Sequence, residues 1–351
     1  MATIRDIAEL ANVSIGTVDR VLHHRGSVSP PTKAKVEWAI QKLKYTPNIY
    51  ARQLKLSRRY KFGVLMPELH QDAGYWEQAA MGIHKAGKEL EPYKIKVKFF
   101  HFNRYSENSF CKKFLQMLAE NLDGLLIAPI LVDQCKELVS RIPEKVPYLF
   151  FDSDLPDTKR FTFIGQDPFK SGILAGKLMK ILIGENGDVA VIRVLPEDYH
   201  INLRAEGFRS YFLENGLKHP IHIYDWYEKK DLAEINALFD KILKENPNLK
   251  GIFMTNALTY LAASYIQSKS LNQKIRIIGY DLVPENVAYL KNSAIDFLIS
   301  QSPMTQGYEG IMMLYRKIVL NHNVEDKIMM PIDIVTKENV EFYKYASVEN
   351  G

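Results

Sequence analysis

Apolar residues recur at helical spacing in two short stretches near the start of the chain. Isoleucines and alanines three and four positions apart predict one helix over residues 4–11, and a similar spacing predicts a second helix that begins after Ser14. The apolar positions are Ile4, Ile7, Ala8 and Ala11 in the first helix and Val18, Val21 and Leu22 in the second. The two helices can therefore bury one shared apolar face.

A third apolar stripe follows. The stretch Ser29-Pro30-Pro31-Thr32 is typical of a helix start, because proline is tolerated in the first turn of a helix. Apolar residues continue from there at helical spacing, at Val36, Ala39, Ile40 and Leu43. We therefore expect three short helices around one small core.

From Lys61 onward, short apolar segments alternate with amphipathic ones. The apolar segments predict strands at 62–66, 97–100, 124–128, 148–151, 189–194, 221–224, 251–254, 275–278 and 295–299. The amphipathic segments predict helices at 76–90, 107–120, 133–141, 168–182, 203–215, 231–245, 257–269, 284–291 and 304–320. This alternation predicts an α/β fold, with mainly parallel sheets covered on both faces. Because these units are too many for one sheet of ordinary size, we expect two α/β lobes.

The connection between the first two helices has the form of a helix-turn-helix motif. Residues 11–13 make a tight turn, and Ser14 stands at the N-cap position, where its hydroxyl can accept a hydrogen bond from a free backbone amide. In this motif the second helix lies in the major groove of DNA, with residues near its N-terminus facing the base edges. A buried helical hairpin with no nucleic-acid partner would show the same apolar pattern.

The net charge of +5 is unevenly distributed along the chain. The first sixty residues contain eleven Lys or Arg and four Asp or Glu, a difference of +7, which leaves −2 for residues 61–351. A compact positive domain beside a near-neutral larger one is expected when only the small domain contacts phosphates. A solvated charged surface is the alternative explanation of the same excess.

Cys111 and Cys135 are the only cysteines, and their spacing matches neither a metal site nor a redox motif. We therefore expect a reduced compartment, with no metal and no cofactor. The chain has no apolar signal core after Met1 and no later run long enough to span a bilayer. These features predict a cytoplasmic protein with no membrane partner.

The first helix pair also matches a specific pattern. A-x-x-A-x-V-S-x-x-T-V-x-R-V-L runs from Ala8 to Leu22, and it resembles the DNA-binding domain of the LacI/GalR family of bacterial repressors. The resemblance continues at 47–54, where P-N-x-x-A-x-x-L is similar to the hinge helix of the family. In the family this helix orders on operator DNA, and a leucine, here Leu54, enters the minor groove and kinks the duplex. Packing of Leu54 between domains is the alternative.

The resemblance implies a domain organisation. Residues from 61 to about 340 resemble the effector domain of the family, which has the fold of periplasmic sugar-binding proteins. The fold class is then a small all-α domain followed by two doubly wound parallel-sheet lobes of the periplasmic-binding-protein type. The expected domains are a helix-turn-helix domain at 1–46, a hinge helix and linker at 47–60, a two-lobed effector-binding and dimerisation domain at 61–340, and a tail at 341–351. In this architecture the chain crosses between the lobes near Gly165, near 299–301 and near 322–324.

The helix-turn-helix and hinge segments together imply a set of DNA contacts. The expected DNA-binding residues are Thr3, Ser14, Ile15, Gly16, Thr17, Asp19, Arg20, His23, Asn48, Ala51, Arg52, Leu54 and Lys55. Asp19 departs from the serine that is usual in the family, and near a phosphate it is repulsive unless it pairs with Arg20 or accepts from a cytosine amino group. Ile15 can only touch a thymine methyl and Gly16 has no side chain. Base discrimination is therefore expected to depend on Arg20.

A second set of residues follows from the predicted sheets. In open α/β sheets, ligands bind outside the carboxyl ends of the strands. This rule selects His70–Trp76, Asp152, Asp198–Arg204, Trp226, Asn256, Asp281 and Gln301. Such residues suit a polyol, because aromatic faces pack against a sugar ring while Asp, Asn, Gln and Arg bond neighbouring hydroxyls. Each residue alone has another explanation, as an interface aromatic, a helix cap or a structural ion-pair partner.

The family resemblance narrows this second set. It implies an aromatic pair against the ligand, the arginine of an R-x-x-G-F motif that clamps it and the acid of a G-Y-D motif. The expected effector-binding residues are Tyr75, Trp76, Asp152, Arg204, Trp226, Asn256, Asp281 and Gln301. Where the family usually has Asn-Asp, this chain has Asn256-Ala257, so a carboxylate that often binds sugar hydroxyls is missing. This departure argues against a simple hexose or galactoside as the effector.

Together these features predict a transcriptional regulator that acts as a repressor. A homodimer would bind near-palindromic operator DNA, and a small carbohydrate-like effector between the lobes would change its operator affinity. No heptad run follows Asp333, so a tetramerising coiled coil is not expected.

Two other classes of protein fit parts of this sequence less well. A solute-binding protein for a sugar is the alternative that residues 61–340 permit, although the basic helical domain and the missing signal peptide argue against it. An enzyme is not expected, because the chain has no GxGxxG, P-loop, GxSxG or HExxH motif and its histidines are scattered. We therefore expect no catalytic residues.

Overall fold

The computed structural model describes residues 4–22, 28–43, 58–227, 232–272 and 274–343. The contacts within the chain divide it into two units, Met1–Ser57 and Arg58–Gly351. Each unit has its own apolar core, as expected of domains that fold separately.

The described residues of the first unit form three helices around one small core. They are α1 (Ile4–Ala11), α2 (Ile15–Leu22) and α3 (Pro30–Lys42). The core residues are Ile7, Ala8, Ala11, Val18, Val21, Val36 and Ala39. The turn between α1 and α2 passes through Asn12, which has a left-handed φ of 51°, and the Ser14 hydroxyl accepts a hydrogen bond from the amide of Thr17 at 3.2 Å. The predicted turn and N-cap are therefore confirmed.

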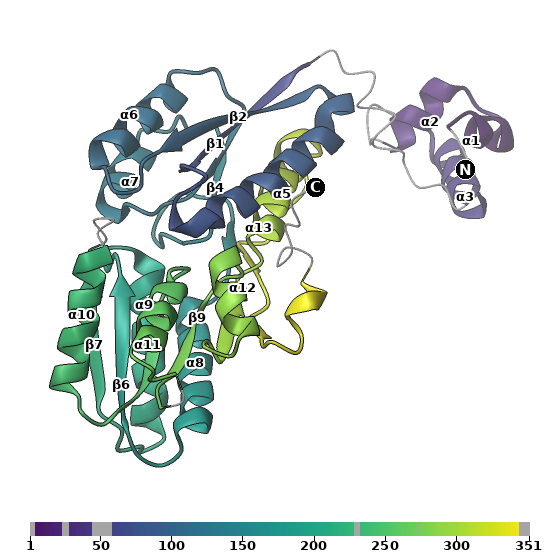
Figure 1. Cartoon of the computed structure of the whole chain (residues 1–351). Coiled ribbons are helices and arrows are strands. Elements are labelled where there is room, and N and C mark those ends of the chain that lie inside the picture. The colour runs from purple at the N-terminus through teal and green to yellow at the C-terminus, as the bar shows by residue number, and fades with distance from the viewer. Residues whose placement is uncertain (1–3, 23–27, 44–57, 228–231, 273, 344–351) are drawn as a thin grey trace. The chain divides into compact units, whose positions relative to one another are not determined.

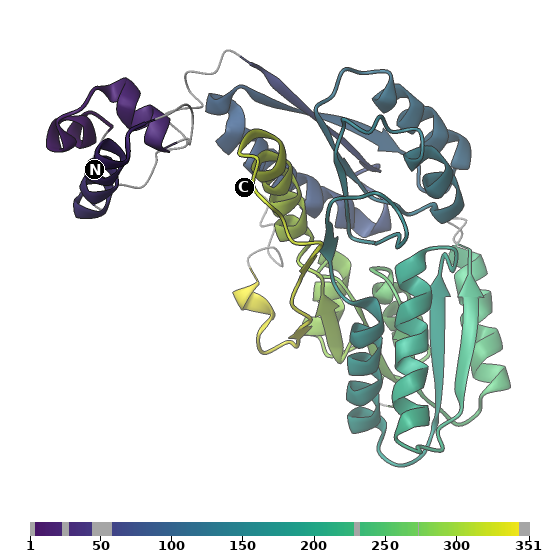
Figure 2. The same cartoon turned by 180° about the vertical axis from the view of Figure 1, so that it is seen from behind.

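The second unit consists of two α/β lobes, and Figures 1 and 2 show them from opposite sides. The sheet of the first lobe has the order β11-β5-β4-β3-β1-β2, and all of its paired strands are parallel. Its strands are β1 (Tyr60–Pro67), β2 (Ile95–Phe102), β3 (Gly124–Ile127), β4 (Tyr148–Phe151), β5 (Phe163–Gly165) and β11 (Lys327–Met329). Its helices are α5 (Tyr75–Leu90) and α13 (Pro303–Leu314), which pack together, and α6 (Glu107–Leu118) and α7 (Val132–Val139).

The second lobe repeats this arrangement with the strand order β12-β10-β9-β8-β6-β7. Its strands are β6 (Asp188–Val194), β7 (Ile221–Trp226), β8 (Leu249–Met254), β9 (Arg276–Tyr280), β10 (Phe297–Ser300) and the antiparallel edge strand β12 (Asp333–Val335). Its helices are α8 (Pro168–Ile183) and α9 (Tyr199–Glu214), which pack together, and α10 (Leu232–Glu245), α11 (Thr259–Ser268) and α12 (Pro284–Lys291). The predicted fold class, with two mainly parallel lobes, is confirmed.

Glycines allow one close helix pair in each lobe. A Cβ atom on Gly82 of α5 would lie 1.9 Å from the carbonyl oxygen of Met304 in α13. In the second lobe, a Cβ atom on Gly207 of α9 would lie 2.0 Å from the carbonyl oxygen of Phe169 in α8. No side chain fits at such distances, so glycine sets how closely these helices approach each other.

Three connections join the lobes, and the third differs from the prediction. The chain crosses between β5 and α8 and again between β10 and α13, close to the predicted places. The third crossing lies between β11 and β12, not near 322–324, because Lys327–Met329 first pairs with β5 in the sheet of the first lobe. The side-chain amide of Gln166 links all three crossings, since its Nε2 donates to the carbonyl oxygens of Ser300 at 2.6 Å and Pro331 at 2.5 Å.

Candidate functional site

The start of α2 presents several of the predicted DNA-binding residues. Ser14, Gly16 and Arg20 are exposed, Ile15 is 49% exposed, and Thr17 is half-buried. The Nε of Arg20 donates to the carbonyl oxygen of Gly16 at 3.2 Å, which holds the guanidinium beside the first turn of α2. Arg20 stands in the last turn of α2, and this bond turns its guanidinium toward the exposed start of the helix, where a base-reading helix makes its contacts.

Other predicted DNA contacts cannot be located. Thr3, His23, Asn48, Ala51, Arg52, Leu54 and Lys55 lie outside the described residues, and so does the side chain of Asp19. The predicted hinge helix at 47–54 therefore stays a prediction.

The second candidate site lies in the unit formed by the two lobes, at the carboxyl ends of strands from both sheets. Residues that follow β1, β2, β3, β4, β8, β9 and β10 converge there with the start of α5 and the first turns of α9. The lining residues are Asp72, Tyr75, Trp76, Arg104, Ile130, Asp152, His200, Arg204, Asn256, Ala257, Asp281 and Gln301. The strand-end rule therefore locates a cavity to which both lobes contribute.

The walls of this cavity lie close together. Its volume is about 20 Å³, which is room for a water molecule but far below the several hundred Å³ typical of a small-molecule site. A sugar can therefore bind only if the two lobes move apart and then close around it.

Two aromatic residues at the start of α5 are tied to carboxylates of the first lobe. The Tyr75 hydroxyl donates to Asp152 at 2.5 Å, and the indole Nε1 of Trp76 donates to Asp72 at 2.7 Å. The rings of Tyr75 and Trp76 meet edge to face at 5.1 Å. These contacts fix both aromatic residues, which are nearly fully buried.

Arg204 of α9 is held by the second lobe and by the second crossing. Its guanidinium donates to the carbonyl oxygen of Thr255 at 2.8 Å and to the side chain of Gln301, and it lies over the Tyr280 ring, 3.8 Å from the centroid. Gln301 in turn donates to both carboxylate oxygens of Asp281, at 2.9 and 3.0 Å. Gln301 therefore fixes the positions of both Arg204 and Asp281.

Burial shifts the ionisation of several of these groups. It raises the pKa of Asp281 to about 7, against the charge of Arg204 and the hydrogen bond from Gln301. Burial also raises the pKa of Asp152, opposed by the hydrogen bond from Tyr75. For His200, burial and then the charges of Arg204 and Arg104 lower the pKa well below its usual value, so the imidazole is neutral at pH 7.

The backbone is strained where these acids stand. Asp152 and Asp281 each have a φ of 70°, and Asp72 has a φ of 52°. Non-glycine residues rarely adopt this left-handed region, and such strain clusters at ligand sites because the surrounding structure has to maintain it.

Three polar lining residues are absent from the expected effector-binding residues, although two of them lie in ranges that the strand-end rule selects. Arg104 follows β2, which extends two residues beyond the predicted strand, and its side chain contacts Asp72 and Asp198. His200 lies inside the selected range Asp198–Arg204, but the sequence does not single it out from the other histidines. Asp72 lay inside the range His70–Trp76 without being singled out.

One predicted effector residue lies apart from the others. Trp226 ends β7 at the same edge of the second sheet, but its ring packs into the core of that lobe and it is not among the lining residues. The other seven predicted residues, from Tyr75 to Gln301, all line the cavity.

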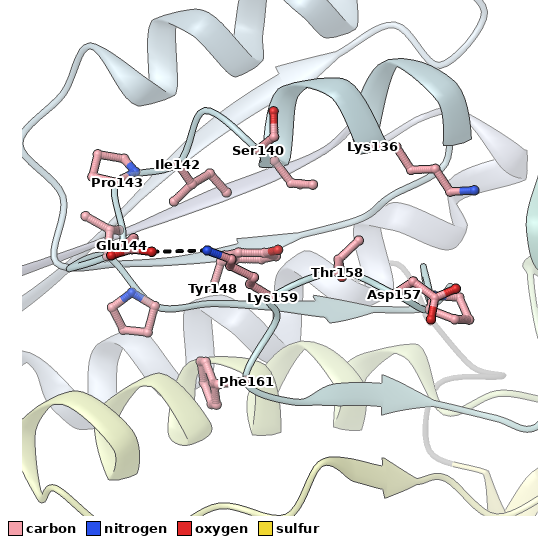
Figure 3. Close-up of a pocket in the computed structure, with 14 residues that line it drawn as sticks. Lys136, Ser140, Ile142, Pro143, Glu144, Tyr148, Asp157, Thr158, Lys159 and Phe161 are labelled. Carbon is pink, nitrogen blue, oxygen red and sulfur yellow. Dashed lines mark hydrogen bonds and ion pairs between the residues drawn. The ribbon is translucent and has the colours of Figure 1, made fainter.

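A larger pocket lies elsewhere on the first lobe, and Figure 3 shows it. It has a volume of about 910 Å³ and lies between the end of α7, the start of β4 and the segment 156–161. An ion pair between Glu144 and Lys159, 3.1 Å apart and both exposed, lies within it. Several buried polar atoms in the described part of the chain have no hydrogen-bond partner, but none of them belongs to a residue that lines this pocket. Size alone therefore does not make it the ligand site.

Comparison with known sequence families decides the class of the protein. The family described as bacterial regulatory proteins of the lacI family matches residues 3–48, and the periplasmic binding protein domain matches residues 62–321. The chain belongs to the LacI family of bacterial regulatory proteins.

Individual relatives agree with this family membership. The LacI-family chain is 26% identical over 354 residues to the ribose operon repressor of Lactococcus lactis, covering 97% of this chain and 98% of the relative. It is 28% identical over 350 residues to the HTH-type transcriptional repressor PurR of Pasteurella multocida, covering 97% and 99%. A solved structure from Bacteroides fragilis, described as a LacI transcriptional regulator, has a TM-score of 0.77 at 27% identity and covers 82% of this chain and all of that one.

The described part of this LacI-family chain also lacks two features. None of its helices there has both the length and the apolar character needed to cross a bilayer. Within the same ranges, no three His, Cys, Asp or Glu side chains are grouped so that they could hold a metal ion.

Proposed function

We propose that this protein is a transcriptional repressor that binds operator DNA as a homodimer, with its operator affinity set by a small carbohydrate-like effector in the cavity between the lobes. The observation that carries the proposal is the combination, in one chain, of a LacI-type helix pair with an exposed α2 and a two-lobed domain whose strand ends meet in a buried polar cavity. The protein acts in the cytoplasm and catalyses no reaction.

DNA recognition begins with α2. Its first turn lies in the major groove, where Ile15 contacts a thymine methyl and Arg20 leaves the Gly16 carbonyl to bond a guanine. Ser14 and Thr17 bond the phosphate backbone, and Asp19 pairs with Arg20 or accepts from a cytosine. The remaining contacts come from Thr3, His23 and the hinge residues Asn48, Ala51, Arg52, Leu54 and Lys55.

Effector recognition uses the cavity. Tyr75 and Trp76 pack against the apolar face of the ligand, Arg204 clamps it, and Asp152, Asn256, Asp281 and Gln301 bond its hydroxyls. Trp226, which the sequence predicts as a further contact, packs in the core of the second lobe and is not part of this proposed site. The repressor names of the relatives support this regulatory function.

Coupling between the two functions follows from the crossings between the lobes. Closing the cavity around a ligand changes the angle between the lobes, which in a dimer moves the two hinge segments relative to each other. A ligand that binds one arrangement more tightly thereby shifts operator affinity.

The test is selection of bound sequences from a random DNA pool by the purified full-length protein, with and without a panel of sugars. We expect an enriched palindrome whose binding one sugar strengthens or abolishes. Sequence-independent, salt-sensitive binding that no sugar alters would contradict the proposal and would favour a sugar-binding protein without a regulatory role.

A variant pair tests the assignment of α2. Arg20→Ala should lose about 1–3 kcal/mol of base discrimination and keep weak, salt-sensitive DNA binding. Lys35→Ala removes the same charge from an exposed position on α3 and should keep the operator preference. Unchanged preference in Arg20→Ala, measured on the selected palindrome, would show that Arg20 does not read a base.

A further inference from the structure

Arg104 occupies a position that the proposed effector contacts leave unexplained. It follows β2 in the first lobe and is only 6% exposed. Its Nη1 donates to Oδ2 of Asp72, and its Nη2 donates to Oδ2 of Asp198, the N-cap residue of α9 in the second lobe, at 2.5 Å. Although burial opposes its charge, Asp72 and Asp198 raise the pKa of Arg104, so it remains a cation. Arg104 is therefore an ionic link between the lobes at the wall of the cavity.

Three atoms around this link have no hydrogen-bond partner. Among the described residues, Oδ1 of Asp72, Nε of Arg104 and Nδ1 of His200 are buried and unpaired. Two donor atoms elsewhere on the cavity wall, Nε of Arg204 and Nδ2 of Asn256, are also unpaired and can donate to further oxygens of the same ligand. The three residues come from different elements, and all of them line the same cavity. Buried polar atoms are nearly always hydrogen-bonded in folded proteins, so unpaired atoms that gather at one cavity indicate a place for a polar ligand group.

The chemistry of these atoms selects the ligand group. Oδ1 of Asp72 can only accept a hydrogen bond, Nε of Arg104 can only donate one, and the neutral imidazole of His200 can do either, depending on its tautomer. A hydroxyl group both donates and accepts, so it can satisfy Asp72 and Arg104 together. A carboxylate or phosphate oxygen only accepts, and it would face the charge of Asp72.

We propose that Asp72, Arg104 and His200 form a further effector-binding subsite that takes an uncharged hydroxyl group, so that the effector is a neutral polyhydroxylated molecule and not a sugar acid or sugar phosphate. This inference rests on the proposed function in one respect, that the cavity is the effector site.

The charge around the cavity supports the same conclusion. Three carboxyl groups, Asp72, Asp152 and Asp281, line it, and a fourth, Asp198, pairs with Arg104, whereas only two guanidinium groups, Arg104 and Arg204, are present there. Arg104 is already engaged by two carboxylates, whereas Arg204 donates through Nη1 and Nη2 to Thr255 and Gln301 and keeps an unpaired Nε. An anionic ligand group at this subsite would therefore have to compete with Asp72 and Asp198 for the guanidinium of Arg104.

The first test compares neutral and charged forms of the same sugars by calorimetry on the full-length protein. The panel contains aldopentoses, aldohexoses, disaccharides and cyclitols, together with the aldonates, phosphates and amino-deoxy derivatives of those sugars. At least one neutral compound should bind, and its aldonate and phosphate should bind about a hundredfold more weakly. Tighter binding of any charged form than of its neutral parent would overturn the inference, and so would failure of every neutral compound to bind.

Variants then assign the preference to this subsite. Asp72→Asn should reduce the preference for the neutral sugar over its aldonate about tenfold or more, because it removes the opposing charge and keeps the shape. Arg104→Met should weaken binding of the neutral sugar about tenfold or more. In the wild type, a monodeoxy sugar that lacks the bound hydroxyl should bind more weakly than its parent sugar. In Arg104→Met, the deoxy sugar and its parent should bind equally well.

Arg160 provides a matched control. Like Arg104, its guanidinium is nearly buried, 7% exposed, and it pairs with two aspartates, Asp154 and Asp326, but it does not line the cavity. Arg160→Met should therefore keep both the affinity and the preference. Equal effects of Arg104→Met and Arg160→Met would mean that Arg104 only stabilises the fold, and an unchanged aldonate preference in Asp72→Asn would remove Asp72 from the subsite.

DNA selection on the wild-type protein separates this inference from the proposed function. A selected operator together with a preference for anionic ligands would overturn only the subsite. Neutral-sugar binding without any operator would overturn only the repressor.

Discussion

At the scale of single residues, Asp281 links the cavity to pH. Its pKa is raised to about 7 by burial, whereas an aspartate in the unfolded chain has a pKa of about 3.9. The folded protein therefore binds a proton that the unfolded chain has already lost between these two values. The stabilising contribution of this proton is complete below about pH 4 and is lost as the pH rises through about 7.

We expect Asp281→Asn to change the pH dependence of unfolding in a defined direction. The variant cannot ionise and can still accept a hydrogen bond from Gln301, so its free energy of unfolding should rise relative to the wild type between pH 5 and pH 8. Urea unfolding at several pH values measures this difference. The free energy of unfolding of the variant is compared with that of the wild type at each pH, because His200 affects both proteins. The lowered pKa of His200 acts in the opposite direction to Asp281 and favours the folded state as the pH rises.

Asp157→Asn is the control for this prediction, because Asp157 is exposed and lies outside the cavity. Its stability curve should run parallel to that of the wild type. A parallel curve for Asp281→Asn as well would mean that Asp281 ionises in the folded protein much as it does in the unfolded chain.

The sequence indicates some residues of the cavity better than others, and the reason is physical. Asp152, Asn256 and Asp281 follow apolar strands within two residues, so the strand-end rule finds them directly. Arg104 obeys the same rule but follows a strand whose last residues, His101 and Phe102, were not predicted to belong to it. Arg104 pairs with Asp198 of the other lobe, and the apolar pattern of a single strand gives no information on how the two lobes meet.

At the scale of elements, the close helix pairs depend on glycine. In α5, a Cβ atom on Gly82 would lie 1.9 Å from the backbone of α13, whereas one on Gly87 would lie 3.4 Å from the nearest atom, in the Val97 side chain. Gly82→Ala should therefore force the helices apart and lower the free energy of unfolding by roughly 1–3 kcal/mol or more. Gly87→Ala, in the same helix, should change it little or raise it by up to about 1 kcal/mol, because alanine favours helix. Chemical denaturation of both variants checks this, and equal effects would show that α5 and α13 tolerate separation.

Element prediction succeeds where segments are long and fails where they are short. The helices predicted at 76–90 and 168–182 match α5 and α8 to within one residue at each end, since their apolar periodicity extends over several turns. The three-residue strands β5, β11 and β12 were not predicted. A segment of three residues shows too little alternation to indicate a strand, and pairing with a neighbour determines its conformation.

At the scale of the whole effector-binding unit, the three crossings between the lobes share one buried side chain. Gln166 is 3% exposed, and its Nε2 bonds the Ser300 and Pro331 carbonyls of the other two crossings. Gln306 continues the link, since it donates to the Gln301 carbonyl and accepts from the amide of Asp152. The segments that bend when the lobes move are therefore bonded to each other and to the wall of the cavity.

Gln166→Leu should weaken both stability and regulation. It leaves two buried carbonyl groups without their donor, which costs about 1–3 kcal/mol in the free energy of unfolding. It also lets each crossing bend independently, so that closing around a ligand fixes the angle between the lobes less firmly, and the ratio of operator affinities with and without sugar should fall. Gln116→Leu, at an exposed position on α6, makes the same chemical change away from the crossings and should alter neither quantity. Loss of stability with an unchanged affinity ratio would mean that the signal between cavity and DNA does not depend on the bonds among the crossings.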